Sequence, residues 1–294
     1  MTAEADGQPA LDDLVRLLDL EQLEVDTFRG TSHPTPRQRV FGGQVAGQAL
    51  VAAGRTVAPE RQVHSLHSYF IRAGDVSVPI VYEVDRVRDG RSFSVRRTVA
   101  IQHGKPIFTL SASFQIEQEG LEHEAAMPDV PMPEDLPTIE ERYADRPEVY
   151  AALLDRPHPI DRRYVNDPSW DQQPSGPRTG ALSLWIRANG MLPDDPLLHV
   201  CILTYASDLT LLDTVLLKHG QSMTQDVVAM ASLDHAMWFL RPFRMDKWIL
   251  YSMKSPAARG GRGFATGRFF ARDGSQLGSV AQEGMIRVRE PRQD

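Results

Sequence analysis

Residues 206–220 read Ala-Ser-Asp-Leu-Thr-Leu-Leu-Asp-Thr-Val-Leu-Leu-Lys-His-Gly, and this stretch decides the predicted fold. Ser207 or Asp208 can accept the free amide protons of a first helical turn, and Gly220 after two cationic residues is a typical stop. Leucines and a valine cover every side of such a helix, so we expect it to be buried and wrapped by other elements. Asp208 then lies at the N-terminus of a buried helix, either as its N-cap or as a functional carboxylate.

Length and composition are those of an ordinary globular protein. The chain has 294 residues, enough for one large domain or two of about 150 residues each. Hydrophobic residues make up 41% and charged residues 24% of the chain, close to globular averages. No apolar run approaches the roughly 20 residues that span a bilayer, the start of the chain is polar and acidic, and its last three residues are not a peroxisomal address. We therefore expect a cytoplasmic protein without membrane insertion.

Charge and cysteine content exclude further classes of protein. The net charge is −7, but eleven acidic residues against two arginines lie within 116–150, so the rest of the chain is close to neutral. Because there is no basic cluster or aromatic platform, we expect no nucleic-acid partner. The single cysteine, Cys201, excludes a disulfide framework and a multi-cysteine metal site, and its apolar neighbours indicate a buried, unreactive thiol.

An acidic, proline-containing segment separates two halves. We predict an N-terminal domain at 1–115, a linker at 116–178 and a C-terminal domain at 179–294. The first part of the linker is expected to be mobile, and residues 139–154 are compatible with a helix. Aromatic residues near the end of the linker indicate that this part packs on another element.

Each half shows one central helix and several strands. In the first half we expect, in order, a helix at 11–18, a strand at 23–28, a turn-rich loop at 29–37, a helix at 41–54, and strands between 63 and 115 that include 80–87, 93–102 and 107–114. In the second half we expect strands at 181–191, 227–239, 249–255, 262–272 and 275–290, with 197–206 as a buried strand or the start of a helix. The turns Asp89-Gly90 and His103-Gly104 indicate antiparallel meanders.

Two nearby histidines, His64 and His67, raise the question of a metal site. Residues three apart on a strand face opposite sides of the sheet, so we expect that these two cannot share one ion. No third ligand stands at metal-site spacing, so we predict no metal.

The two halves repeat one pattern. Ser65-Leu66-His67-Ser68-Tyr69-Phe70-Ile71-Arg72 is similar to Ser232-Leu233-Asp234-His235-Ala236-Met237-Trp238-Phe239-Leu240-Arg241. The turns His103-Gly104 and Asp273-Gly274 recur at an offset of about 170 residues, which is typical of a duplicated domain. Two such sheets joined edge to edge would form a dimer within one chain.

Several long motifs in fixed order resemble the acyl-CoA thioesterase II family, the double hot-dog thioesterases. They are Val40-Phe41-Gly42-Gly43-Gln44, His64-Ser65-Leu66-His67-Ser68-Tyr69-Phe70, Asp234-His235-Ala236-Met237-Trp238-Phe239 and Gln282-Glu283-Gly284. The resemblance runs from about Leu11 to Arg289 and is weakest in the linker. It implies an α+β double hot-dog fold, in which two helix-wrapped antiparallel sheets join into one continuous sheet, and assembly into a homo-oligomer.

The resemblance also implies hydrolysis of fatty acyl-CoA to a fatty acid and CoA, without a cofactor. In that family an Asp, a Ser or Thr, and a Gln hold the attacking water, and the matching residues are Asp208, Ser232 and Gln282. The residues alone support this less strongly. Gln282 shares a strand face with apolar residues, so its amide needs a partner, either backbone or a catalytic group. At a helix N-terminus Asp208 should stay ionised and orient water.

Substrate contacts are predicted at five positions. The amides of Gly42 and Gly43, at the start of a helix, are open to a carbonyl oxygen, although donors on the second-half helix are an alternative. Arg72, Arg259 and Arg262 are candidates for the CoA phosphates, or are simply solvated surface arginines.

Two alternatives remain open at this point. A hot-dog hydratase or dehydratase carries a His five residues after the central-helix Asp, but the residue at that distance from Asp208 is Asp213. A non-catalytic acyl-CoA binding protein would not need an intact Asp208, Ser232 and Gln282. An α/β-hydrolase is disfavoured because the chain has no Gly-X-Ser-X-Gly motif.

Overall fold

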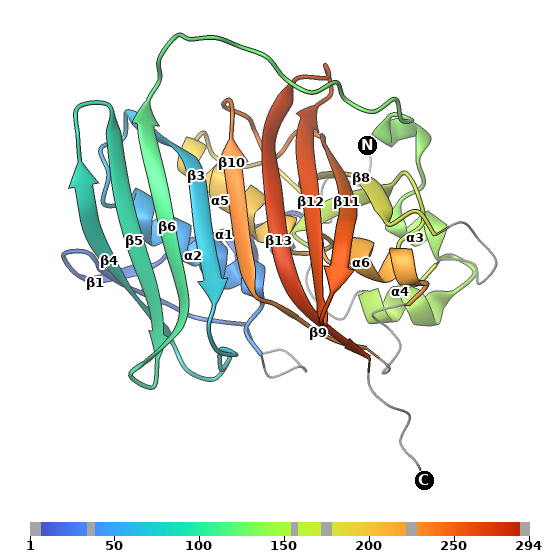
Figure 1. The fold of residues 1–294 in the computed structure, drawn as a ribbon, viewed down its shortest axis with the longest axis horizontal. Coiled ribbons are helices and arrows are strands. Elements are labelled where there is room, and N and C mark those ends of the chain that lie inside the picture. The colour runs from blue at the N-terminus through green and yellow to red at the C-terminus, as the bar shows by residue number, and fades with distance from the viewer. Residues whose placement is uncertain (1–6, 34–38, 154–157, 172–177, 222–227, 289–294) are drawn as a thin grey trace.

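The computed structural model describes residues 7–33, 39–153, 158–171, 178–221 and 228–288. Its strands form one 13-stranded antiparallel sheet, with helices behind the sheet in the view of Figure 1. The strands are β1 Glu21–Glu24, β2 Thr27–Gly30, β3 Arg61–Phe70, β4 Ile80–Asp89, β5 Phe93–Gln102, β6 Lys105–Ile116, β7 Ile160–Tyr164, β8 Ala181–Ala188, β9 Val228–Ser232, β10 Asp234–Phe239, β11 Ile249–Arg259, β12 Arg262–Ala271 and β13 Gln276–Val288. The helices are α1 Gln8–Leu18, α2 Gly42–Gly54, α3 Ile139–Arg142, α4 Pro147–Leu153, α5 Pro196–Ser207, α6 Asp213–His219 and the short 3-10 helix η1 Pro133–Asp135.

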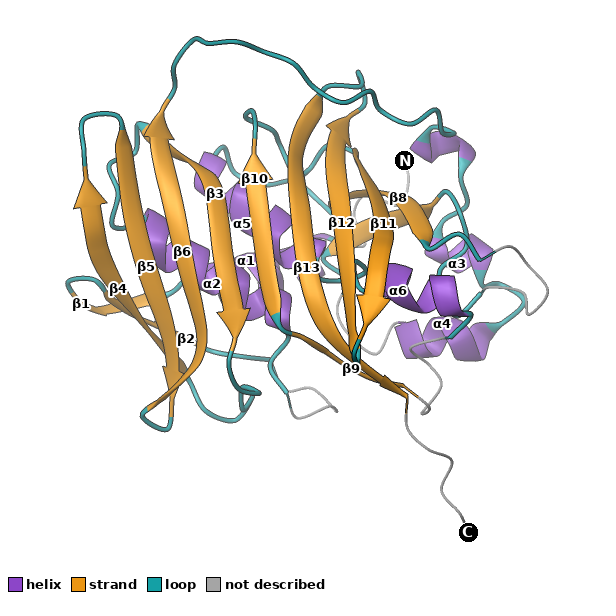
Figure 2. Ribbon diagram, in the orientation of Figure 1, coloured by secondary structure: helices purple, strands orange, loops and turns teal. Residues whose placement is uncertain are grey.

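The strand orders of the two halves mirror each other about the join between them. Along the sheet the strands run β1-β2-β4-β5-β6-β3 and then β10-β13-β12-β11-β8-β7, while β9 pairs with β13. The join is the antiparallel pairing of β3 with β10, which places Ser68 opposite His235 and Leu66 opposite Met237. These strands carry the two copies of the repeated sequence. The expected edge-to-edge joining of two antiparallel sheets is therefore confirmed (Figure 2).

The two central helices, α2 and α5, pack against each other and against the inner face of the sheet. Small residues permit this close approach: a Cβ on Gly47 of α2 would lie 3.3 Å from the carbonyl oxygen of Cys201 on α5. Cys201 is fully buried, and burial raises the pKa of its thiol, which confirms the expected unreactive cysteine. Among the described helices, none has the length and apolar character needed to span a membrane.

The predicted single helix over 206–220 is wrong, because the structure has two helices there. The first, α5, begins earlier, where Pro196 occupies the first turn and the Asp195 carboxylate accepts the amide protons of Leu197 and Leu198. It ends at Ser207, so Asp208 is a C-cap and not an N-cap. A turn over residues 208–212 leads into α6, which stops as expected at Gly220 with a φ of 61°.

The predicted strand at 23–28 is also wrong. The segment is a tight hairpin of β1 and β2, with Asp26 at a φ of 64° in the turn. The expected helices at 11–18 and 41–54 and the first-half strands at 80–87, 93–102 and 107–114 are confirmed within a few residues. Parts of four other predicted elements fall outside the described residues, at 34–37, 154, 227 and 289–290.

The acidic segment 116–178 is more structured than a spacer. The helix predicted at 139–154 is present as two pieces, α3 and α4, within the described residues up to 153, and strand β7 joins the edge of the sheet beside β8. Tyr164 and Trp170 pack edge to face at 6.1 Å between ring centres, and Trp170 packs against the hydrophobic core, so the end of the segment does pack on other elements. The stretch 117–132 contains no helix or strand and crosses from β6 to the second half (Figure 1).

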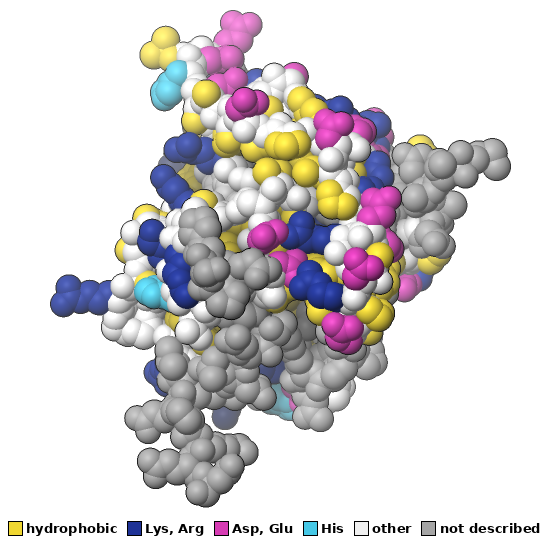
Figure 3. Space-filling model, turned by 90° about the vertical axis from the view of Figure 1, so that its right-hand side faces the viewer, with side chains coloured by type: hydrophobic (Ala, Val, Ile, Leu, Met, Phe, Trp, Pro, Cys, Tyr) yellow, Lys and Arg dark blue, Asp and Glu magenta, His cyan; other side chains and the backbone are white. Residues whose placement is uncertain are grey.

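Arginines pair with acidic residues of this segment. The pairs are Glu124 with Arg241, Glu134 with Arg272, Asp167 and Asp171 with Arg142, and Asp171 with Arg146. On the face of the molecule that Figure 3 shows, acidic and basic side chains are accordingly interspersed.

His64 and His67 do not face opposite sides, contrary to the expectation for a regular strand. The register of β3 shifts between Val63 and Ser65, and this bulge turns His64 to the outer face, where its Nε2 lies 2.8 Å from the hydroxyl of Ser113. His67 packs against Trp238 on the same face. The described residues contain no group of three His, Cys, Asp or Glu side chains that could hold a metal ion.

Candidate active site

Asp208, Ser232 and Gln282 meet on the inner side of the second-half sheet. The Gln282 amide nitrogen donates to Asp208 Oδ1 at 2.8 Å and to Ser232 Oγ at 2.8 Å. The Ser232 hydroxyl donates to the same Asp208 oxygen at 3.3 Å. Both protons of the Gln282 amide are therefore used to hold an acidic and a hydroxyl side chain together.

Three separate elements supply these side chains. Asp208 caps the end of α5, Ser232 is the last residue of β9, and Gln282 lies fully buried in β13. β9 pairs with β13 so that Ser232 is opposite Gly284, two residues from Gln282 on the same face. A Cβ on Gly284 would lie 2.5 Å from Leu212, so the missing side chain lets the turn after Asp208 approach the sheet.

The N-terminus of α2 faces the Asp208 carboxylate. A Cβ on Gly42 would lie 2.6 Å from Asp208 Oδ2, and one on Gly43 would lie 2.4 Å from the carbonyl oxygen of Tyr205. The Gly43 amide donates a hydrogen bond to the Asp208 carboxylate. A helix N-terminus does therefore favour the ionised carboxylate, but it belongs to the first-half helix and not to the helix that carries Asp208.

Burial is the largest influence on the pKa of Asp208. Residue 208 keeps some exposed surface, yet desolvation of its carboxyl group raises its pKa above the usual value. The nearby ring of His235 and the hydrogen bonds from Gln282, Ser232 and Gly43 act in the opposite direction, so they favour the carboxylate. A carboxylate whose proton affinity exceeds that of an exposed Asp is a better base for water.

His235 was not singled out from the sequence, and it lies beside this group. Its ring is 1% exposed, and its Nε2 is 2.8 Å from the hydroxyl of Ser207, the residue that precedes Asp208. Burial lowers the pKa of the His235 ring, whereas the charge of Asp208 raises it. The available signal was alternation in β10, where His235, Met237 and Phe239 point inward.

The three arginines predicted to contact substrate do not meet at Asp208. Arg72 follows β3 and donates to the carbonyl of Pro106 at 2.5 Å. Arg259 and Arg262 pair across the β11–β12 hairpin on the outer face of the sheet, and Arg262 binds Glu283. Gln282 lies on the inner face, so the contact of these arginines with CoA stays a prediction.

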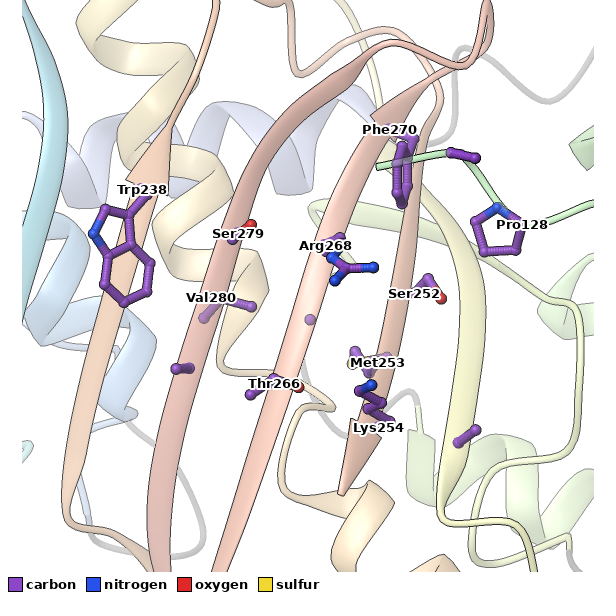
Figure 4. Close-up of a pocket in the computed structure, with 14 residues that line it drawn as sticks. Pro128, Trp238, Ser252, Met253, Lys254, Thr266, Arg268, Phe270, Ser279 and Val280 are labelled. Carbon is purple, nitrogen blue, oxygen red and sulfur yellow. The ribbon is translucent and has the colours of Figure 1, made fainter. Parts of the chain in front are cut away.

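A groove of about 420 Å³ lies on the opposite, outer face of the second half. Figure 4 shows Trp238 on β10, Arg268 on β12 and Lys254 on β11 along it, with Pro128 of the crossing stretch at its edge. None of the triad residues, Asp208, Ser232 and Gln282, lines it. The groove is therefore separate from the candidate active site.

Comparisons with known proteins agree with this architecture. Residues 154–285 match the family described as acyl-CoA thioesterase, and residues 31–115 match the acyl-CoA thioesterase N-terminal domain. The chain is 44% identical over 286 residues to human acyl-coenzyme A thioesterase 8, which covers 93% of this chain and 88% of the human protein. The chain belongs to the acyl-CoA thioesterase II family.

Solved structures of similar proteins share the fold of this family member. The acyl-CoA thioesterase II TesB2 of Mycobacterium marinum is 44% identical, with a TM-score of 0.78 over 94% of this chain and 99% of that structure. A hot-dog protein from Alicyclobacillus acidocaldarius is 22% identical, with a TM-score of 0.77 over 95% of this chain and 99% of its own. The α+β double hot-dog fold expected from the sequence is therefore confirmed.

Proposed function

We propose that this acyl-CoA thioester hydrolase cleaves fatty acyl-CoA by a water molecule that Asp208, Ser232 and Gln282 hold and activate. Membership of the family supplies the reaction, and the geometry supports the three residues. The observation that carries the assignment is the Gln282 amide, which donates both of its protons within the group, to Asp208 and to Ser232. A buried amide that donates both of its protons fixes the orientation of a carboxylate whose pKa is raised by burial.

The chemistry needs one base and one set of donors. The water oxygen attacks the thioester carbonyl carbon while Asp208 accepts a water proton. The Gln282 amide orients the carboxylate and the Ser232 hydroxyl, whose oxygens accept the protons of the water. The carbon–sulfur bond then breaks, the proton passes to the sulfur, and a carboxylic acid and CoA are released.

The developing oxyanion is assigned to the first turn of α2. Gly42 lies beside Asp208, the Gly43 amide already donates to the Asp208 carboxylate, and the positive end of the helix dipole points at the site. Removal of one oxyanion donor typically costs about 3 kcal/mol of transition-state stabilisation. This role gives the Gly42-Gly43 pair a reason beyond close packing.

The test is release of free CoA thiol from saturated acyl-CoAs of increasing chain length. Wild type should turn over part of the series, while Asp208→Asn, Ser232→Ala and Gln282→Ala should lose most of kcat. Asp213→Asn is the control, since Asp213 is a buried carboxyl whose Oδ2 accepts from the Ser169 amide at 2.9 Å and does not join Asp208, Ser232 and Gln282. Full activity in Asp208→Asn, or binding of every acyl-CoA without turnover by wild type, would refute the proposal.

A further inference from the structure

His235 and Gln282 are neighbours across two strands. The pairing of β10 with β13 sets Ala236 opposite Ala281, so the next pair in the antiparallel register brings His235 opposite Gln282. Both side chains point to the inner face and are buried, at 1% and 0% exposed. His235 therefore lies directly behind the amide that holds the triad together.

One ring nitrogen of His235 holds the end of α5. The Ser207 hydroxyl donates its proton to the carbonyl of Thr204 at 2.8 Å, so His235 Nε2, at 2.8 Å from the same oxygen, is the donor in that contact. The Tyr251 hydroxyl donates to the backbone carbonyl of Ser207 at 3.0 Å. Ser207 is thus held from β10 and β11, immediately before Asp208.

The other ring nitrogen, Nδ1, has no hydrogen-bond partner, and neither does the amide oxygen of Gln282. Both atoms are buried. With Nε2 donating to Ser207, a neutral ring presents Nδ1 as an acceptor to the amide oxygen, which is also an acceptor. A protonated ring would donate to Gln282 Oε1 and to Ser207 at once. Burial lowers the pKa of the His235 ring, while Asp208 and the Gln282 side chain favour its charged form.

We propose that His235 is a positioning residue for the hydrolysis proposed above, on which this inference rests. The ring holds Gln282 by its amide oxygen, which keeps the amide nitrogen turned toward Asp208 and Ser232. It also holds the carboxylate in place through Ser207. A flipped Gln282 would turn its oxygen to the Asp208 carboxylate and lose both donated bonds, so the ring selects the productive orientation.

A change of His235 should also alter the titration of Asp208. The ionisable groups that face Asp208 are His235 from β10 and Tyr251 from β11, and those that face His235 are Asp208 and Asp234. A protonated His235 ring lowers the pKa of Asp208, as does the Gln282 bond that the ring supports. Loss of the ring therefore raises the pKa of Asp208, and activity should begin at a higher pH.

The experiment compares three variants of His235 with a matched buried histidine. His235→Leu keeps volume and removes both ring contacts, His235→Asn retains an amide at the level of Nδ1, and His235→Gln retains one at the level of Nε2. His199→Asn is the control, because His199 is 2% exposed on the same helix as Ser207 but bonds to the amide of Met245. Each variant is checked by circular dichroism and thermal melting, and the pH dependence of kcat and KM for acyl-CoA hydrolysis is then measured.

We expect His235→Leu to lower kcat by about 100-fold, the cost of a displacement of about 1 Å in a catalytic group, with little change of KM. Its acidic limb of kcat/KM should move to higher pH, while His235→Asn or His235→Gln recovers part of kcat. His199→Asn should melt earlier and keep the wild-type pH profile. A folded His235→Leu with wild-type kcat and pH profile overturns the positioning role while Asp208→Asn remains inactive, whereas full activity in Asp208→Asn overturns the proposed function and this inference with it.

Discussion

Asp213 provides a quantitative test of the buried electrostatics near the site. The residue opens α6, is 1% exposed, and receives one hydrogen bond, from the Ser169 amide at 2.9 Å. Its second carboxyl oxygen is buried and has no hydrogen-bond partner. Burial raises the pKa of Asp213 from 3.8 to about 6, against the smaller effect of Ser169.

The sign of the effect on stability follows from this shift. The folded state holds the Asp213 proton to higher pH than the unfolded state does, so the free energy of unfolding falls as pH rises from about 4 to about 6. The full loss is about 3 kcal/mol, since one pKa unit corresponds to about 1.4 kcal/mol. Roughly half of it, about 1.4 kcal/mol, is expressed between pH 5 and pH 8.

Asp213→Asn cannot lose this proton, so its stability relative to wild type should increase by about 1.4 kcal/mol from pH 5 to pH 8. Urea denaturation of both proteins at the two pH values, followed by tryptophan fluorescence, measures the change. Asp246→Asn is the control, because the pKa of Asp246 is shifted in the opposite direction. Arg244 holds this pKa below its usual value, so no gain of stability between pH 5 and pH 8 is expected. A stability difference between Asp213→Asn and wild type that is the same at both pH values would refute the reasoning.

Three further substitutions or reagents test other parts of the structure. Gly42→Ala places a methyl group 2.6 Å from Asp208 Oδ2, so kcat should fall by about 100-fold in a folded protein; wild-type kcat contradicts the assigned proximity. Arg96→Met leaves buried carbonyls without the donor that now serves them, so the free energy of unfolding should fall by about 3 kcal/mol, and a loss within error in urea denaturation contradicts this. Cys201 should react with an aromatic disulfide reagent only after unfolding, and rapid labelling of the native protein contradicts its burial.

The sequence predicted the architecture well because it contains the pattern twice. The repeat of 65–72 in 232–241 anticipates the β3–β10 join, which depends on strand pairing between similar segments. The small residues of 42–54 predicted a helix pressed against other backbone, and α2 is nearly all buried. The meeting of Asp208, Ser232 and Gln282 was anticipated only through the family resemblance, since no spacing in the chain relates them.

What the sequence did not predict depends on single backbone choices and on tertiary contacts. The break at Asp208 is hidden because apolar residues continue on both sides of it, through α5 and α6. The positive φ of Asp26 divides an apparent strand into a hairpin, and one bulge residue in β3 reverses the direction of His64. The role of His235 was not predicted because it depends on the pairing of β13 with β10. Assembly into a homo-oligomer and a cytoplasmic location stay predictions.

The most direct test of the central claim follows the oxygen of the attacking water. Wild-type protein in excess over its best acyl-CoA substrate is allowed one turnover in ¹⁸O-labelled water, and the released acid and the peptide containing Asp208 are analysed by mass spectrometry. Direct attack by a water held by Asp208, Ser232 and Gln282 predicts one ¹⁸O in the acid and none in Asp208. Unlabelled acid with ¹⁸O in the Asp208 carboxylate would show that Asp208 is itself the nucleophile, and would contradict the account.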